Sequence, residues 1–227
     1  MRLGSCTWPD VPWDAPAVLL IPLGATEQHG PHLPLETDTL IAAALADAVA
    51  AGRPEVVVAP AVPYGSSGEH ADFAGTLSLG QEVFEAAVVE LVRSAEGFGA
   101  VVLLSWHGGN AEPLARAVAR LRAEGRSVVC WRPSLEVADA HAGRAETSLM
   151  LAIAPALVGA ERPVGVTDPL FKMMPALREH GLRAVSPNGV LGDARGATEQ
   201  EGQAVLAELA ADLGAFLDTT RSASALG

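Results

Sequence analysis

The sequence has few cysteines and few basic residues, and each shortage excludes a class of protein. Two cysteines in 227 residues, Cys6 and Cys130, are too few for a disulfide framework, so we expect a reducing, cytoplasmic setting. The chain has 15 Lys and Arg against 27 Asp and Glu, a net charge of −12, which argues against a basic surface for nucleic acid or a polybasic membrane patch. It also has no run of about 20 apolar residues, and residues 1–14 do not resemble a secretory signal. We therefore expect neither nucleic acid nor a membrane as a partner.

The composition that remains is that of an ordinary globular protein. Hydrophobic residues make up 49% of the chain and charged residues 19%, which excludes a disordered or fibrous protein. A chain of 227 residues has room for one domain that folds without a disulfide or a structural metal. No internal repeat or low-complexity linker divides it, so we expect residues 1–227 to form a single domain.

Short apolar runs alternate with helical patterns along the chain. The runs are rich in Val and Leu and do not alternate with polar residues, as is typical of strands that are covered on both faces. They comprise residues 17–23, 55–59, 100–104 and 127–131. Helical spacing of apolar residues follows at 40–51, 83–92, 114–121 and about 198–217. This order predicts a three-layer α/β/α domain with a mostly parallel sheet.

The sequence also indicates where one helix begins and which segment lacks a clear pattern. Asn110 is a candidate N-cap for the helix that includes residues 114–121. Residues 155–196 have scattered Gly and Pro and only weak periodicity. That segment either covers the functional site or forms a surface for a partner.

Most of the histidines follow the predicted strands. In an open α/β sheet, ligands bind beyond the carboxyl ends of the strands. His29 and His32 follow the first strand, His70 the second, His107 the third and His141 the fourth, whereas His180 lies elsewhere. Five of the six histidines are thus expected at one edge of the sheet.

Carboxylates accompany these histidines. Taken singly, each has a simple structural explanation: Glu27 lies in a polar loop, and Asp38 and Glu146 fall where carboxylates stabilise the first turn of a helix. Taken with His29 and His107, they form a set of two imidazoles and three carboxylates. Such nitrogen and oxygen ligands suit two divalent cations, with Zn, Fe or Mn as candidates. We therefore treat Glu27, His29, Asp38, His107 and Glu146 as candidate metal ligands.

The segment His107-Gly-Gly-Asn110 allows a second interpretation. Paired glycines that open a helix are also found in phosphate-binding loops. The segment lacks the full Gly-x-Gly-x-x-Gly spacing and the Lys-Ser/Thr pair of a nucleotide-binding loop, which weakens a nucleotide-binding role. A third possibility is a structural subunit whose metals only hold the loops together.

Four motifs in order resemble the creatininase family. They are PLGATEQHGPHLPLETD at 22–38, YGSSGEH at 64–70 with Gly75 and Thr76, HGGN at 107–110, and HAGRAETS at 141–148. The resemblance runs from about residue 19 to the last helix. It implies a homo-oligomeric amidohydrolase with two divalent metals, held by the five residues above with Asp38 as the bridge.

The resemblance also narrows the substrate. AVSPNGVLGD at 184–193 and the short chain are most similar to a branch of the family that removes a C-terminal Val-Tyr dipeptide from a modified ribosomal peptide. Other members of the family open creatinine or deformylate a formamidopyrimidine, so a small cyclic amide or formamide is the alternative substrate.

Two residues depart from the pattern of the family. Creatininases carry a carboxylate ligand two residues after the third-strand histidine, where this chain has Gly109, so Glu146 is assigned in its place. The residue before that histidine is usually Gly in the branch, and here it is Trp106, which either lines the pocket or packs at the strand end.

The expected mechanism uses several further residues. Two metals lower the pKa of a water molecule, which becomes the nucleophile. Backbone N–H groups of Gly108 and Gly109 are candidates to stabilise the oxyanion. His141 is the candidate acid that protonates the leaving nitrogen. His32 and His70 are expected to face the substrate or to support the ligands.

Overall fold

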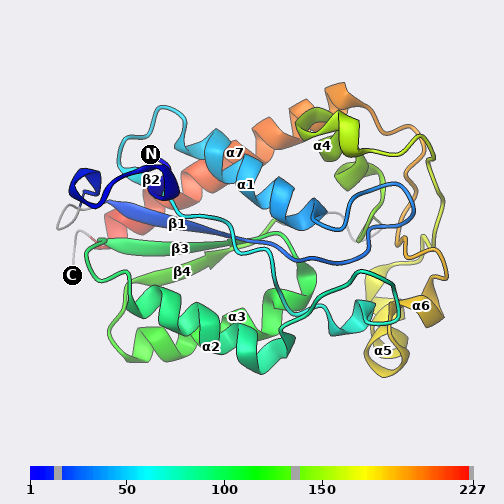
Figure 1. The fold of residues 1–227 in the computed structure, drawn as a ribbon, viewed down its shortest axis with the longest axis horizontal. Helices are drawn as coiled ribbons and strands as arrows, with labels where there is room; N and C mark the ends of the chain where they lie inside the picture. The colour runs from blue at the N-terminus through cyan, green and yellow to red at the C-terminus, as the bar shows by residue number, and fades with distance from the viewer. Residues whose placement is uncertain (13–16, 134–138, 225–227) are drawn as a thin grey trace.

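The computed structural model describes residues 1–12, 17–133 and 139–224, and its centre is a four-stranded parallel sheet (Figure 1). The strands are β1 Val18–Leu23, β2 Val56–Val58, β3 Ala100–Ser105 and β4 Val128–Trp131. Their order is β2-β1-β3-β4, and each neighbouring pair is parallel. All four strands lie within or next to the predicted apolar runs, and the predicted three-layer α/β/α fold is confirmed.

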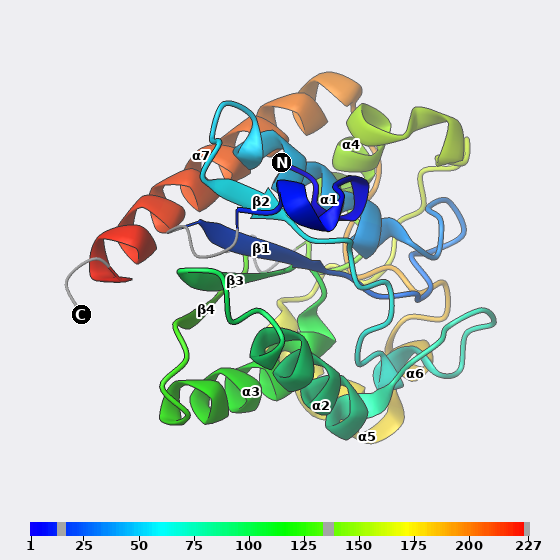
Figure 2. The same cartoon turned by 60° about the vertical axis from the view of Figure 1, so that its left-hand side comes forward.

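Helices cover both faces of the sheet (Figure 2). The helices are α1 Thr37–Ala50, α2 Gly80–Arg93, α3 Ala111–Ala123, α4 Arg144–Ile153, α5 Leu170–His180, α6 Leu182–Val185 and α7 Glu199–Ser224. Short 3-10 turns occur at Leu3–Ser5 (η1), Trp8–Asp10 (η2), Gly68–His70 (η3), Gly108–Asn110 (η4) and Pro155–Leu157 (η5). Among the described residues, no helix combines the length and apolar character needed to cross a membrane. The helices expected from apolar spacing are all present, although α7 continues beyond residue 217.

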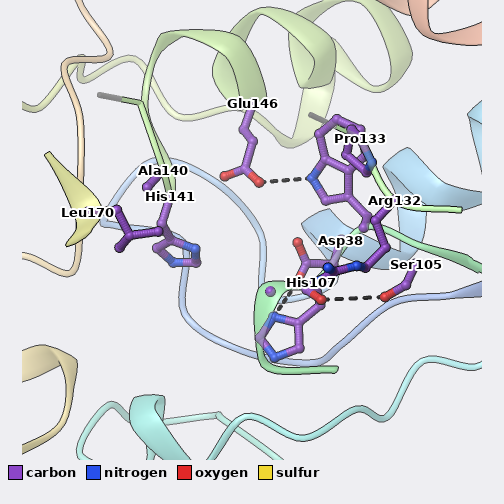
Figure 3. Close-up of a pocket in the computed structure, with 11 residues that line it drawn as sticks. Asp38, Ser105, His107, Arg132, Pro133, Ala140, His141, Glu146 and Leu170 are labelled. Carbon is purple, nitrogen blue, oxygen red and sulfur yellow. Dashed lines mark hydrogen bonds and ion pairs between the residues drawn. The ribbon is translucent and has the colours of Figure 1, made fainter. Parts of the chain in front are cut away.

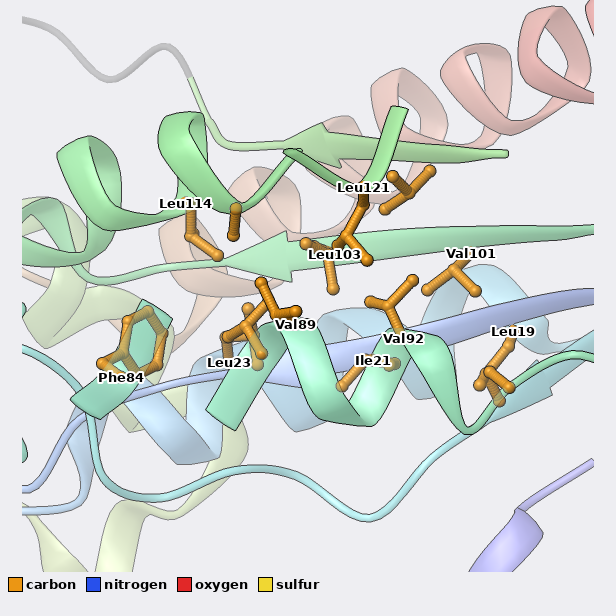
Figure 4. Close-up of a cluster of buried hydrophobic side chains, with 14 of the residues drawn as sticks. Leu19, Ile21, Leu23, Phe84, Val89, Val92, Val101, Leu103, Leu114 and Leu121 are labelled. Carbon is orange, nitrogen blue, oxygen red and sulfur yellow. The ribbon is translucent and has the colours of Figure 1, made fainter. Parts of the chain in front are cut away.

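The two faces of the sheet bury different residues of the same strands. Leu19 and Ile21 of β1 face α2 and α3, where they pack with Phe84 in one apolar cluster (Figure 4). Leu20 faces the other way and packs with residues of α1 and α7, including Leu213. This two-sided burial explains why the strand sequences are apolar throughout rather than alternating.

The segment 155–196, which had weak periodicity, contains α5 and α6 and covers the carboxyl edge of the sheet. Met173 of α5 and Leu182 of α6 pack with Leu191, and Phe73 from the loop after β2 lies against them. Leu170, the first residue of α5, lines the cavity described below. Part of this segment therefore covers the site, as one of the two expected roles requires.

Candidate metal centre

The five predicted ligands converge at the carboxyl edge of the sheet. Glu27 and His29 lie in the loop after β1, Asp38 in the first turn of α1, His107 directly beyond β3 and Glu146 in the first turn of α4. All five are buried, with exposed fractions between 0% and 5%. Because parallel strands end at the same edge, residues that are far apart in sequence meet here. The site that was expected from the order of the motifs is therefore assembled.

Asp38 stands between two groups of these side chains. Its Oδ1 lies 3.1 Å from Nε2 of His29, and its Oδ2 lies 3.4 Å from Nδ1 of His107. Two groups in the structure have ligand atoms within 4.8 Å of one another and share Asp38: one with Glu27 and His107, the other with His29 and Glu146. A carboxylate that two such groups share could serve as a ligand to a cation in either group.

Several buried carboxylate oxygens in this centre have no hydrogen bond. Within the described residues, these are both oxygens of Glu27 and Oδ2 of Asp38. A buried carboxylate without hydrogen bonds is costly unless a cation compensates its charge. The donor set and its unsatisfied oxygens therefore fit divalent cations.

The pKa shifts in the centre also indicate a site that attracts positive charge. Burial alone lowers the pKa of His107 and of His29, yet Glu27 beside His107 and Asp38 beside His29 raise each pKa to about 10. Burial tends to raise the pKa of Glu27, but His107 and His70 hold it well below its usual range. The carboxylates thus attract positive charge strongly enough to outweigh the burial of two imidazolium groups.

Glu146 is held by two hydrogen bonds. Nε1 of Trp106 donates to its Oε1 at 2.8 Å, and the backbone N–H of Ala142 donates to its Oε2 at 2.6 Å. Burial raises the pKa of this carboxyl group. Trp106 is 6% exposed and also lines the cavity, so the two roles considered for it are combined in one residue. Glu146 and Asp38 are therefore more than residues that match the helix dipole.

The other histidines have different surroundings. Nε2 of His70 lies 3.2 Å from Oε1 of Glu27, and His141 stacks at 4.3 Å from the ring of His29. His141 also belongs to a third candidate ligand group, with Glu27 and His29. Burial lowers the pKa of His70 to about 4 and that of His141 well below its usual value. His32 points elsewhere, with Nε2 2.8 Å from the hydroxyl oxygen of Thr147.

Two residues organise these loops in ways that the sequence did not reveal. The side-chain nitrogen of Gln28 lies 3.1 Å from a ring nitrogen of both His70 and His141. Its position between Glu27 and His29 was the available signal. Asn110 occupies the N-cap position of α3, but its side chain makes no capping hydrogen bond. Instead it accepts from the backbone N–H of Ser66 and donates to the carbonyl of Gly24, so the predicted N-cap position is confirmed, while the side chain connects two other loops.

Gly109, the second glycine after His107, sits in a crowded part of the turn. A Cβ on Gly109 would lie 2.2 Å from the carbonyl oxygen of Ser66 and 2.4 Å from Nε2 of His107. A carboxylate side chain at this position therefore has no room. Nδ1 of His107 faces Glu27 and Asp38, whose charges would repel a phosphate, so the structure does not support the nucleotide-binding interpretation.

A cavity of about 230 Å³ opens onto this centre (Figure 3). Its lining combines candidate ligands with residues from the end of β3, from the loops after β3 and β4, and from α5. It includes Asp38, Ser105, Trp106, His107, Gly108, Arg132, Pro133, Ala140, His141, Glu146 and Leu170. A ligand in this cavity therefore lies beside both groups that share Asp38.

The fold and this centre are those of a metal-dependent amide hydrolase, and the comparisons with known proteins agree. A family model described as creatinine amidohydrolase matches residues 4–217. The chain belongs to the creatininase family. This confirms the resemblance found in the motifs and places the chain among hydrolases of amide and peptide bonds.

Curated relatives match most of the chain. A mycofactocin precursor peptide peptidase of Mycolicibacterium smegmatis (strain ATCC 700084 / mc(2)155) is 50% identical over 200 residues, which cover 85% of this chain and 81% of the relative. One of the same name from Mycobacterium ulcerans (strain Agy99) is 46% identical and covers 93% of this chain and 88% of its own length. A creatinine amidohydrolase of Pseudomonas putida is 30% identical over 90% of this chain and 91% of its own length. The branch expected from residues 184–193 is thus the one to which the first two relatives belong.

Solved structures with the same fold carry metals in their descriptions. A creatininase described as the Mn form has a TM-score of 0.74 and 26% identity, covering 95% of this chain and 96% of that one. A mutant creatininase described as the Zn–Zn type has a TM-score of 0.71, 26% identity and the same coverage. The candidate ligand groups described above are in keeping with a family whose structures include Mn and Zn forms.

Proposed function

We propose that this chain is a dinuclear-metal peptidase that removes the C-terminal Val-Tyr dipeptide from the modified mycofactocin precursor peptide. The observation that carries the proposal is the pair of ligand groups that share Asp38 beneath a cavity. The relatives at 46% and 50% identity support the choice of a peptide over creatinine or a formamide.

The proposed centre holds two divalent ions, Fe²⁺, Zn²⁺ or Mn²⁺. Glu27, Asp38 and His107 form one position, and His29, Asp38 and Glu146 form the other. When bound, such ions polarise a carbonyl and lower the pKa of water. The hydrogen bonds from Trp106 and Ala142 fix the orientation of the Glu146 carboxylate, which is the role of support around a metal ligand.

The chain's own groups complete the proposed chemistry. The backbone N–H groups of Gly108 and Gly109 lie beside His107 and are proposed to stabilise negative charge on the carbonyl oxygen of the substrate. His141 lines the cavity and is proposed to take up the proton that the attacking water loses and to deliver it to the leaving nitrogen. Leu170 and Trp106 form apolar parts of the wall and reduce the access of water. His70 and Gln28 hold Glu27 and His141 in place, whereas His32 supports α4 through Thr147.

The test is incubation of the protein with the modified precursor peptide, followed by mass spectrometry. We expect release of a dipeptide that stops after exhaustive chelation and returns when Fe²⁺, Zn²⁺ or Mn²⁺ is added back. Hydrolysis that survives metal removal would refute the mechanism. Turnover of creatinine or a formamide in place of the peptide would favour the alternative substrate class. Metal binding without turnover of any of these amides would make the chain a structural subunit.

His141 has a test of its own. If His141 delivers a proton, His141→Ala retains the metal content of the wild type and turns over slowly. Loss of metal in this variant would reassign His141 as a ligand, because it also belongs to the third candidate group.

Two further parts of the proposal concern the setting of the enzyme. We propose that the chain forms a homo-oligomer in the cytoplasm and that residues 1–227 act as one domain. Sedimentation analysis of the purified protein tests the oligomer, and a monomer at micromolar concentration would contradict it.

A further inference from the structure

Arg132 lies in the wall of the cavity and makes no hydrogen bond or ion pair with any other residue that the structure describes. It directly follows β4, and it lines the same cavity as Asp38, His107 and Glu146 (Figure 3). Its side chain is exposed. Among the described residues that line the cavity, Arg132 is the one with a permanent positive charge.

The absence of a partner sets Arg132 apart from the other arginines. Every other arginine whose side chain the structure describes donates a hydrogen bond to a carboxylate, an amide oxygen or a backbone carbonyl. These are Arg2, Arg53, Arg93, Arg116, Arg120, Arg122, Arg126, Arg144, Arg162, Arg178, Arg183 and Arg195. Arg132 has no hydrogen bond or ion pair within residues 1–12, 17–133 and 139–224. In a chain with a net charge of −12, an unpaired guanidinium beside a cavity is available for an anionic ligand.

The charges in the cavity are separated. The floor carries the carboxylates of Asp38 and Glu146, which are turned toward His29 and His107. Arg132 makes no ion pair with either carboxylate, although all three line one cavity. The structure therefore combines a floor that suits cations with a wall that suits an anion.

We propose that Arg132 binds the terminal carboxylate of the peptide substrate and thereby sets where the chain is cut. This inference rests on the proposed function, because it assumes that the scissile bond lies near the C-terminus. Two extended residues span about 7 Å, so a carboxylate two residues beyond the scissile bond stays within reach of one small cavity. The planar guanidinium can donate two parallel hydrogen bonds to that carboxylate. A substrate whose terminal carboxylate lies at Arg132 and whose scissile bond lies at the candidate metal centre releases a dipeptide rather than a longer fragment.

The experiment measures binding of the product to the metal-loaded protein, so that it does not depend on cleavage. The two probes are the dipeptide Val-Tyr and its C-terminal amide, titrated by calorimetry into the wild type and into Arg132→Gln. We expect the wild type to bind the free carboxylate about 10- to 100-fold more tightly than the amide. Arg132→Gln should bind both probes with the affinity that the wild type has for the amide.

Two further variants sharpen the interpretation. Arg132→Lys keeps the charge but loses the two-pronged donor, so it should recover only part of the preference for the carboxylate. Arg116→Gln removes an exposed arginine on α3 that pairs with Glu85, and it should retain the full preference. Metal content and melting temperature of each variant establish that the centre is intact.

The outcomes separate this inference from the proposed function. An equal preference for the carboxylate in the wild type and in Arg132→Gln would overturn the role of Arg132, even if the precursor peptide is cleaved. So would a wild type that does not distinguish the two probes. If the precursor peptide is not cleaved but Val-Tyr binds in the expected Arg132-dependent manner, the assigned reaction fails and the carboxylate site stands.

Discussion

The apolar cluster between the sheet and helices α2 and α3 is as deeply buried as the polar centre at the end of the same strands. Leu103 in β3 and Phe84 in α2 have exposed fractions of 0%, and Glu27 and His29 have the same value. The chemistry of the two regions is opposite. One contains close-packed side chains without polar atoms, and the other contains carboxylates and imidazoles, some without hydrogen bonds.

This contrast shows how the molecule separates stability from function. Burial of apolar side chains stabilises the fold by about 1.5–3 kcal/mol for each large residue. Burial of carboxylate oxygens without hydrogen bonds has the opposite sign. The two regions meet at β3, where Leu103 belongs to the apolar cluster and His107, just beyond the strand, belongs to the polar centre. The apolar layers thus supply the stability that keeps the loops of the polar centre together, although the buried carboxylates of these loops repel one another.

The largest effect is expected for Asp38→Asn. If Asp38 bridges two ions, loss of its negative charge removes metal from both positions and lowers kcat/KM for the peptide by at least about 1,000-fold. The metal-free variant should unfold with a lower free energy than the metal-free wild type, because the buried ring of His29 loses the carboxylate that pairs with it. Metal analysis gives the metal content, peptide-cleavage kinetics give kcat/KM, and denaturant titration gives the free energy of unfolding.

Asp47→Asn is the matched control for that substitution. It lies on the same helix, where its exposed carboxylate pairs with Arg2. Metal content and activity should be unchanged, since exposed ion pairs contribute little. Equal loss of metal in both variants would mean that Asp38 acts through the stability of α1 rather than as a ligand.

Phe84→Ala tests the other region. The side chain is fully buried in the apolar cluster, so truncation should lower the free energy of unfolding by about 3–5 kcal/mol. Metal affinity of the protein that remains folded should stay within about twofold of the wild type, because Phe84 lies on α2, which carries none of the candidate ligands. A loss of metal affinity comparable to the loss of stability would show that the two regions are not separable.

The sequence was sufficient for the sheet and for the assembly of the centre. The apolar runs predicted all four strands because each is covered on both faces, and their order placed His29, His107 and Glu146 at one edge. Apolar spacing put the start of α1 at residue 40, whereas the carboxylate of Asp38 indicated an earlier start, and the structure confirms the latter. The helix begins at Thr37, before the first apolar residues of the pattern, and this places Asp38 inside the first turn.

The parts that could not be predicted depend on contacts between loops. Asn110 has the residue type of a cap, but its side chain is used to connect Gly24 and Ser66, which lie on other loops. The hydrogen bond between Trp106 and Glu146 joins residues from the ends of β3 and α4, and no periodic pattern reports such a contact. Arg132 likewise became informative only when the partners of the other arginines were known.

Gly109→Ala probes the boundary between the two regions. Its new methyl group would collide with the carbonyl of Ser66 and with His107, so we expect a loss of about 1–3 kcal/mol in unfolding free energy together with weaker metal binding. Gly108→Ala is the control, because no atom lies within 4 Å of a Cβ built there. Its unfolding free energy and metal content should match the wild type. Similar losses in both variants would show that flexibility of the turn, rather than its crowding, matters.

The smallest effect is expected for Trp106→Phe, which tests whether the polar centre depends on its hydrogen bonds. The substitution keeps most of the apolar ring but removes the N–H that orients Glu146, so metal affinity should fall by about 10- to 100-fold. Trp131→Phe is the control. It removes a comparable hydrogen bond to Asp212 on α7, away from the ligands, and should leave metal affinity unchanged. If Trp106→Phe binds metal as the wild type does, Glu146 is held by Ala142 alone or is not a ligand, and metal titration of Glu146→Gln separates these two cases.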